Sequence, residues 1–120
     1  MIRFVILGAL ASMKNRRIPT KTNPRVTIPN KAAQSFARDF LLQVPRSACL
    51  TLGSPSRPLR TKVTVYYRDM RSDLDVALVY DLLQKASVVR NDRYIREKIE
   101  IARIDKANPR VEIEISEITE

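Results

Sequence analysis

The chain has 120 residues, of which 44% are hydrophobic and 29% charged, a composition that suits one soluble domain and excludes wholesale disorder. The net charge of +9 is unevenly placed: residues 1–71 hold 14 Lys/Arg against 2 Asp/Glu, and residues 72–120 hold 8 against 11. The basic first part favours a polyanionic partner such as nucleic acid. With no histidine and one cysteine, Cys49, the sequence offers no imidazole base, no internal disulfide and no CxxC zinc site.

The apolar run at residues 2–7 predicts a buried first strand. With Arg3 before it and Ala9-x-Ala11 after it, the run also has features of a secretory signal, which we consider the lesser alternative. Residues 12–31 are rich in Lys, Arg, Asn, Thr and Pro, which predicts a basic loop or irregular hairpin.

A helix is predicted to follow, with Asn30 as its N-cap and Val44 as its last residue, because Pro45 cannot continue it. Apolar residues recur at helical spacing and should form its buried face: Ala33, Phe36, Ala37, Phe40, Leu41 and Val44.

The middle of the chain alternates loops with a strand. Residues 47–60 contain Gly and Pro and should be mostly loop, with a short strand near residues 49–52. Residues 62–67 alternate apolar and polar side chains, which predicts a strand with one buried face. Residues 68–72 should form a polar turn.

A second helix is predicted after Asp75, and residues 87–92 should end it and turn the chain. Its apolar stripe consists of Leu78, Val79, Leu82, Leu83 and Ala86. Residues 94–104 predict a strand, although the polar part at 93–98 is compatible with a helical turn.

Residues 105–109 form a strong turn signal, and residues 111–115 alternate cleanly as a last strand. The whole chain, residues 1–120, is therefore predicted to be a single α+β domain with a mixed β-sheet and two main helices packed on one face.

Acidic residues are the readiest source of chemistry in a chain without histidine, because carboxylates and substrate phosphates bind Mg²⁺. In extended chain, Asp73 and Asp75 point to the same side of Leu74. A plainer interpretation is that Asp75 caps the following helix and Asp73 is solvated. Asp92 is equally explained as a turn residue after Asn91.

Asp81 lies inside the second predicted helix, four residues before Lys85. For this residue we favour the plain explanation, an exposed i, i+4 ion pair.

Three segments in chain order resemble the core signature of the RusA family of Holliday-junction resolvases, small proteins of phages and prophages. They are Arg71-Ser72-Asp73-Leu74-Asp75, Asp81-Leu82-Leu83-Gln84-Lys85-Ala86 and Asn91-Asp92. The turn at residues 11–17 and the closing strand at residues 110–115 match the family in position and character, so the resemblance extends over nearly the whole chain.

The resemblance implies a homodimer with an α/β fold that cuts four-way DNA junctions symmetrically with Mg²⁺, for which Mn²⁺ is a possible substitute. Carried over to this sequence, the catalytic, metal-binding residues are Asp73, Asp75 and Asp92. Phosphate contacts are expected from the basic segment and the turn before the acids: Lys14, Asn15, Arg16, Arg17, Lys21, Arg25 and Arg71.

The sequence departs from the family at two points. Asn91 replaces one acid of the acidic pair, and Val79 stands where the family has a lysine. Lys85 and Lys98 are candidate auxiliary cations. Two alternatives therefore stay open: a non-catalytic DNA-binding relative, and a nuclease that acts on other branched DNA.

The four tyrosines are expected in the core or at an interface rather than as base-stacking surfaces; they are Tyr66, Tyr67, Tyr80 and Tyr94. No stretch of sequence is long enough to span a membrane, and no small-molecule cofactor is expected. A lone cysteine suits a reducing compartment, so we expect the cytoplasm of a bacterial host.

Overall fold

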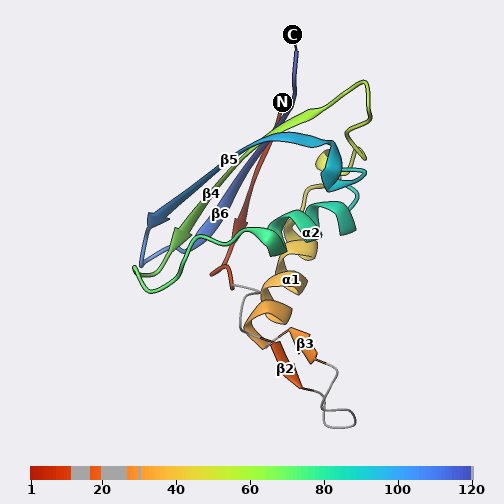
Figure 1. Cartoon of the computed structure of the whole chain (residues 1–120). Helices are drawn as coiled ribbons and strands as arrows, with labels where there is room; N and C mark the ends of the chain where they lie inside the picture. The colour runs from red at the N-terminus through yellow and green to blue at the C-terminus, as the bar shows by residue number, and fades with distance from the viewer. Residues whose placement is uncertain (12–16, 20–26, 30, 120) are drawn as a thin grey trace.

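The computed structural model describes residues 1–11, 17–19, 27–29 and 31–119. A four-stranded sheet with the order β1-β6-β4-β5 forms its centre (Figure 1). Its strands are β1 (Ile2–Leu7), β4 (Leu59–Tyr67), β5 (Ile95–Ile104) and β6 (Arg110–Glu117). The β1–β6 and β6–β4 pairs are antiparallel and β4–β5 is parallel, so the sheet is mixed, as predicted.

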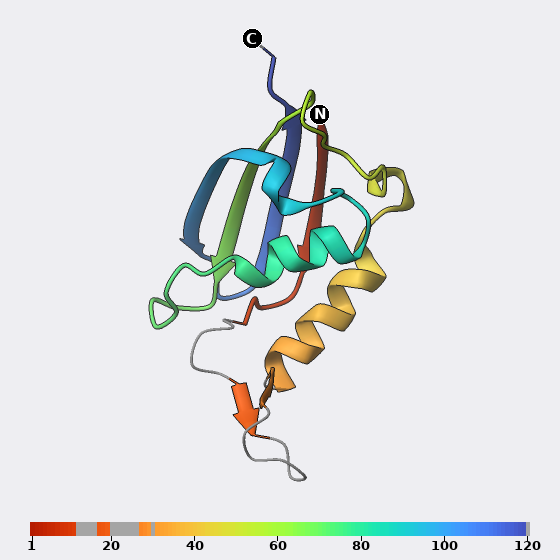
Figure 2. The same ribbon diagram turned by 45° about the vertical axis from the view of Figure 1, so that its right-hand side comes forward.

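Two helices, α1 (Lys31–Gln43) and α2 (Ala77–Lys85), cover one face of this sheet (Figures 1 and 2). Their buried residues are Ala33, Phe36 and Phe40 in α1 and Leu78, Val79, Tyr80, Leu82 and Leu83 in α2. The helical apolar spacing thus predicted the buried faces, with one exception. Leu41 is 38% exposed, at the edge of the groove between the two helices.

The strands bury alternate side chains, because successive residues of a strand point to opposite faces. In β4 every second residue from Leu59 to Tyr67 is buried against the helices. The same alternation buries Phe4 and Ile6 of β1 and the three apolar residues of β6 between Val111 and Ile115. The α+β architecture predicted from the sequence is therefore confirmed.

The connection from β4 through α2 to β5 joins two parallel, neighbouring strands. Such a crossover must carry the chain back along the length of the sheet, and α2 does this. The segment after β4 and the segment before β5 consequently lie at opposite ends of the sheet. This topology determines where the candidate site residues lie.

A separate two-stranded hairpin, β2 (Arg17–Pro19) and β3 (Thr27–Pro29), precedes α1 and lies away from the four-stranded sheet (Figure 1). The irregular hairpin predicted for the basic segment is thus confirmed in its two short strands. The predicted N-cap, Asn30, lies outside the described residues.

The strand predicted near residues 49–52 is wrong. A short 3-10 helix, η1 (Arg46–Ala48), precedes this segment, and a single bridge between Leu52 and Val89 replaces the strand. Positive φ angles of 51° at Thr51 and 100° at Gly53 interrupt the extended conformation that a strand requires. The helical turn compatible with residues 93–98 is confined to η2 (Asp92–Tyr94).

The described part of the chain contains no helix that is long and apolar enough to cross a membrane.

Candidate functional site

The loop between β4 and α2 carries the first two candidate acids. The Tyr67 hydroxyl at the end of β4 donates to the Asp73 carbonyl oxygen (3.1 Å) and accepts from the Asp75 amide (3.4 Å). The Asp75 side chain is buried, and its Oδ1 accepts from the Ala77 amide at the start of α2 (3.2 Å). Asp73 is exposed. A buried tyrosine therefore fixes the backbone of both aspartates at one end of the sheet.

The electrostatics of this end follow from the same contacts. Burial raises the pKa of the Tyr67 phenol; the hydrogen bond from the Asp75 amide partly offsets this, and the charges of Asp75 and Asp73 add smaller increases. The phenol therefore stays protonated at neutral pH and can keep donating to the loop. The plain interpretation of Asp75 as the cap of the following helix is confirmed in part: its side chain accepts from the first amide of α2, but Val76 occupies the N-cap position.

Asp92 lies at the other end of α2, in η2. Its amide donates to Gln84 Oε1 (3.2 Å), and the preceding Asn91 Oδ1 accepts from the Arg93 amide (3.0 Å). Asp92 is exposed. Its local role is thus that of a turn residue at the carboxyl end of the helix, as the plainer interpretation predicted.

The three predicted metal ligands are not brought together within one chain. The nine residues of α2 separate Asp75 from Asp92, about 12 Å along the helix axis at 1.5 Å per residue. Within residues 1–11, 17–19, 27–29 and 31–119, no three acidic or cysteine side chains form a group that could hold a metal ion. The parallel pairing of β4 and β5 causes this separation.

Neither the position where the resemblance predicts a lysine nor the two candidate auxiliary cations lie beside Asp73 and Asp75. Val79, in the position of the family's lysine, is fully buried in the core. Lys98 Nζ lies 4.3 Å from the centroid of the Tyr80 ring, against the middle of α2. Lys85 is the exposed last residue of α2 and lines the groove between α1 and α2. Asp81 is exposed as expected, but among the described ion pairs none joins it to Lys85.

Most of the predicted DNA contacts fall outside the described residues: Lys14, Asn15, Arg16, Lys21 and Arg25. Arg17 begins β2. Arg71 is exposed in the turn after β4, where its amide donates to Asp69 Oδ1 (2.9 Å). This places one predicted phosphate contact two residues before Asp73.

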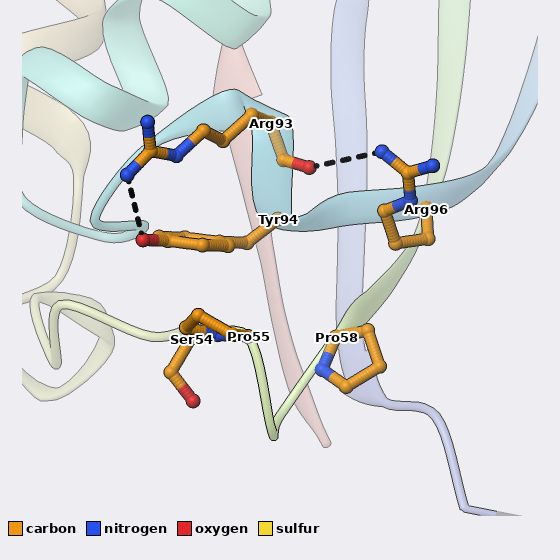
Figure 3. Close-up of a pocket in the computed structure, with 6 residues that line it drawn as sticks. All are labelled: Ser54, Pro55, Pro58, Arg93, Tyr94 and Arg96. Atoms are coloured by element: carbon orange, nitrogen blue, oxygen red, sulfur yellow. Dashed lines mark hydrogen bonds between the residues drawn. The ribbon is translucent and has the colours of Figure 1, made fainter.

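Sequence reasoning missed a basic pocket beside η2. It has a volume of about 420 Å³ and is lined by Ser54, Pro55, Pro58, Arg93, Tyr94 and Arg96 (Figure 3). The sequence feature that could have indicated this pocket is the arginine at every third position, 90, 93 and 96. It was overlooked because residues 72–120 as a whole carry a net negative charge. Tyr94, expected in the core or at an interface, is only half-buried and forms one wall of this pocket.

Comparisons with known proteins give no identity for the chain: no protein-family profile matches it, and no curated protein matches it significantly.

Proposed function

We propose that the chain is a Mg²⁺-dependent, structure-specific endodeoxyribonuclease that resolves four-way DNA junctions by symmetric phosphodiester hydrolysis. The observation that carries the proposal is the Asp73–Asp75 pair, whose backbone the Tyr67 hydroxyl holds at the carboxyl end of β4. Two aspartates on a backbone that Tyr67 holds, close to the exposed Arg71, form an arrangement suited to a phosphodiester. It supplies acidic ligands and a cation within a few residues of each other.

The donor set at this end fits Mg²⁺, because the ion is commonly held by one or two carboxylates together with substrate phosphate oxygens and water. Asp73 would offer an exposed carboxylate, and Asp75 would offer a buried one two residues further along the chain. Mn²⁺ prefers the same oxygen ligands and would substitute. When bound, the ion supplies charge neutralisation at the phosphate and a water of lowered pKa.

Asp92 is assigned to this reaction by the sequence resemblance alone, and its role as a third ligand stays a prediction. Asp92 is exposed and directly precedes Arg93 in η2, where DNA held on the basic surface would reach it. Phosphate contacts from the basic residues before α1 complete the proposed DNA-binding surface.

We propose a homodimer, because symmetric cleavage of a two-fold junction requires two active sites related by a two-fold axis. The free edge of β5 supports this proposal. In the described residues, β5 pairs only with β4, whereas the opposite edge of the sheet is blocked at Leu7. There the Gln43 amide bonds both the backbone nitrogen (2.8 Å) and the carbonyl oxygen (2.9 Å) of Leu7.

The sequence of β5 is complementary to a second, antiparallel copy of itself. With the two-fold axis at Glu100, Glu97 lies opposite Arg103 of the second copy and Ile99 lies opposite Ile101. Ile99 is 47% exposed in the single chain. The two facing Glu100 carboxylates are flanked by Lys98 of each strand, which offsets their repulsion.

A non-catalytic protein that binds branched DNA is the second candidate. It is favoured by the buried Val79 and by the distance along α2 between Asp75 and Asp92. A nuclease that prefers flaps or forks is a variant of the first candidate, and a panel of branched substrates separates the two.

The chain is proposed to act in the cytoplasm of a bacterial host, where an exposed thiol such as Cys49 stays reduced.

The experiment is a cleavage assay on a labelled four-way junction and a matched linear duplex, with Mg²⁺, with Mn²⁺ and with EDTA. We expect paired, symmetric nicks in the junction only, and only with metal. Asp75→Asn should reduce the cleavage rate at least a hundredfold, since it removes a ligand charge without changing shape. Asp81→Asn, which neutralises an exposed aspartate in α2, is the matched control and should cut normally.

Tight junction binding without cutting in either metal would overturn the enzyme proposal and establish the non-catalytic candidate. Equal cutting of flaps and junctions would replace the resolvase assignment by a broader branched-DNA nuclease. Asp92→Asn in the same assay shows whether the far end of α2 takes part in the chemistry.

A further inference from the structure

The pocket beside η2 is built from two loops that are tied together by backbone hydrogen bonds. The Leu52 amide donates to the Val88 carbonyl oxygen (3.0 Å), and the Arg90 amide donates to the Leu52 carbonyl oxygen (2.8 Å). The turn that forms the floor is closed by reciprocal bonds between Ser54 and Arg57, of 3.2 and 3.0 Å. The pocket is therefore preorganised by the fold and does not depend on a ligand for its shape.

Its walls differ in chemistry. Figure 3 shows the Tyr94 ring edge-on, with the Arg93 side chain on one side and Ser54, Pro55 and Pro58 on the other. The Arg93 guanidinium donates to the Tyr94 hydroxyl (2.9 Å), and its carbon lies 5.0 Å from the ring centroid. One face of the ring is thus supported by a cation, and the other borders the open space.

The positive charge at the pocket has no ion-pair partner in the part of the chain that the structure describes. Among the ion pairs of the described residues, none includes Arg93 or Arg96, although Glu97 pairs with Arg60 close by. The Arg96 guanidinium donates only a long bond to the Arg93 carbonyl oxygen, 3.4 Å. Both guanidinium groups therefore have donors left for an anionic ligand.

We propose that this pocket binds one unpaired nucleotide of a DNA strand, with its base against the free face of Tyr94 and its phosphate at Arg93 and Arg96. An aromatic ring faced by proline rings suits a flat base, and stacking of this kind is tolerant of sequence. The volume of about 420 Å³ lies in the range of ligand pockets, roughly 300–1,000 Å³. This inference deepens the proposed function and rests on it, since branched DNA exposes such nucleotides at its crossover.

The position of the pocket gives the nucleotide a role. Arg93 and Tyr94 directly follow Asp92 in η2, so a strand anchored here passes the carboxyl end of α2. An unstacked base held in the pocket would keep the junction open at its branch point. The pocket would then contribute to the selection of branched DNA over linear duplex.

The test uses the full chain and a four-way junction carrying 2-aminopurine at its branch point, in EDTA so that nothing is cut. The fluorescence of this base analogue is quenched when it stacks on an aromatic ring. We expect quenching on binding, and we expect Tyr94→Leu to abolish it and to weaken junction affinity about tenfold. Tyr94→Phe, which keeps the ring, should retain both.

Tyr66→Leu is the matched control. Tyr66 is also a partly exposed tyrosine whose ring faces an arginine, with the Arg110 guanidinium carbon 3.7 Å from the ring centroid, but it lies on the face of the sheet that the helices do not cover. It should leave quenching and affinity unchanged. Circular dichroism and the melting temperature of each variant show that it is folded. Undiminished quenching and affinity in folded Tyr94→Leu would overturn the proposal.

A second variant tests the phosphate contact without touching an aromatic residue. Arg96→Gln should lower the slope of log affinity against log salt by about one, as expected for one lost phosphate contact. Lys62→Gln, on the uncovered face of the sheet and outside the pocket, should leave the slope unchanged. An unchanged slope in Arg96→Gln would remove phosphate from the proposal and so overturn it.

Failure of this inference and failure of the proposed function are distinguishable. If the junction is cut with Mg²⁺ while Tyr94→Leu binds and quenches normally, the pocket proposal alone is wrong. If no cutting occurs but Tyr94 controls binding and quenching, the pocket proposal stands and the enzyme proposal falls. Tighter binding of a single RNA strand than of the junction would reject branched DNA as the ligand.

Discussion

At the amino end of α2, Asp73 and Asp75 lie beside the Tyr67 hydroxyl, whereas at its carboxyl end Arg93 and Arg96 flank a pocket beside Tyr94. The acidic end is anchored by a buried tyrosine, and the basic end by loops hydrogen-bonded to each other. The signs of the charges agree with the helix dipole, which favours anions at the amino end and cations at the carboxyl end. Separate ends of one short helix can thus serve different parts of a polyanionic ligand at little cost in stability.

The comparison also shows why net charge alone is a poor guide to this surface. Residues 72–120 carry more acids than bases, yet three of their five arginines, at positions 90, 93 and 96, lie in or near η2, while most glutamates lie on the sheet. On the uncovered face of the sheet, Glu114 pairs with Arg3 and Lys62, and Glu112 with Arg110. Glu112 and Glu114 are thus neutralised locally, whereas Arg93 and Arg96 are left for a ligand.

The middle of α2 separates its acidic end from its basic end. A substitution in this buried part should have the largest effect on the free energy of unfolding. Val79→Lys would place a lysine at a fully buried position, and should lower the free energy of unfolding by roughly 3–5 kcal/mol, since an unpaired charge would be buried. Urea denaturation measures this. Ala77→Lys, at an exposed position of the same helix, is the control; equal stability of the two variants would show that the site accommodates a lysine.

Tyr80, also in the middle of α2, bonds the buried Thr61 hydroxyl (2.8 Å). Tyr80→Phe should lower the free energy of unfolding by about 1–3 kcal/mol, because Thr61 loses its partner. The double variant with Thr61→Val should recover much of this loss. Denaturant titration measures the free energy of unfolding of each variant. If the losses in the two single variants simply add in the double variant, the hydrogen bond between Tyr80 and Thr61 does not contribute specifically.

The same tyrosine predicts a pH dependence. Burial raises the pKa of Tyr80 to about 12, from an ordinary value of 10.0. The unfolded chain therefore loses this proton first, and stability is full below pH 10.0 and falls as the pH rises toward about 12. The slope of unfolding free energy against pH in this window should be smaller in Tyr80→Phe. An unchanged slope would assign the dependence to other groups, such as Tyr67.

Tyr67→Phe tests the acidic end of α2. Removing this hydroxyl deletes the bonds to Asp73 and Asp75, which should cost about 1 kcal/mol of stability and loosen the loop. Hydrogen exchange at the Asp75 amide should accelerate, while amides of η2 at the other end of α2 should exchange as before. Equal acceleration at both ends would show that the two ends are not independent.

The smallest effect is expected at the proposed dimer interface along β5, which would add a second copy of both ends of α2. Glu97→Arg should weaken self-association roughly two- to thirtyfold, since the proposed dimer would contain two Glu97–Arg103 pairs. Reversing both charges, Glu97→Arg with Arg103→Glu, should restore it. Sedimentation measures the equilibrium, and Glu114→Arg on β6 is the control. A strictly monomeric protein at every concentration would reject the β5 interface.

Local pattern predicted much of the fold, because burial of a periodic apolar face is decided by neighbouring residues. The alternation in β4 and β6 and the helical spacing in α1 and α2 each predicted an element within a few residues of its observed bounds. The prediction of a strand near residues 49–52 was wrong because Thr51 adopts a left-handed backbone conformation, which is uncommon for threonine and is not indicated by the sequence.

The sequence by itself determined the elements, the mixed α+β class and the acids at the start of α2. Only the tertiary structure decided that Asp92 lies at the far end of α2 from Asp75, because parallel pairing of β4 and β5 is a long-range choice. It also decided that Val79 is buried and that Tyr94 lines a pocket with Pro55 and Pro58. Sites of this kind join residues some forty positions apart, and no local periodicity encodes their contact.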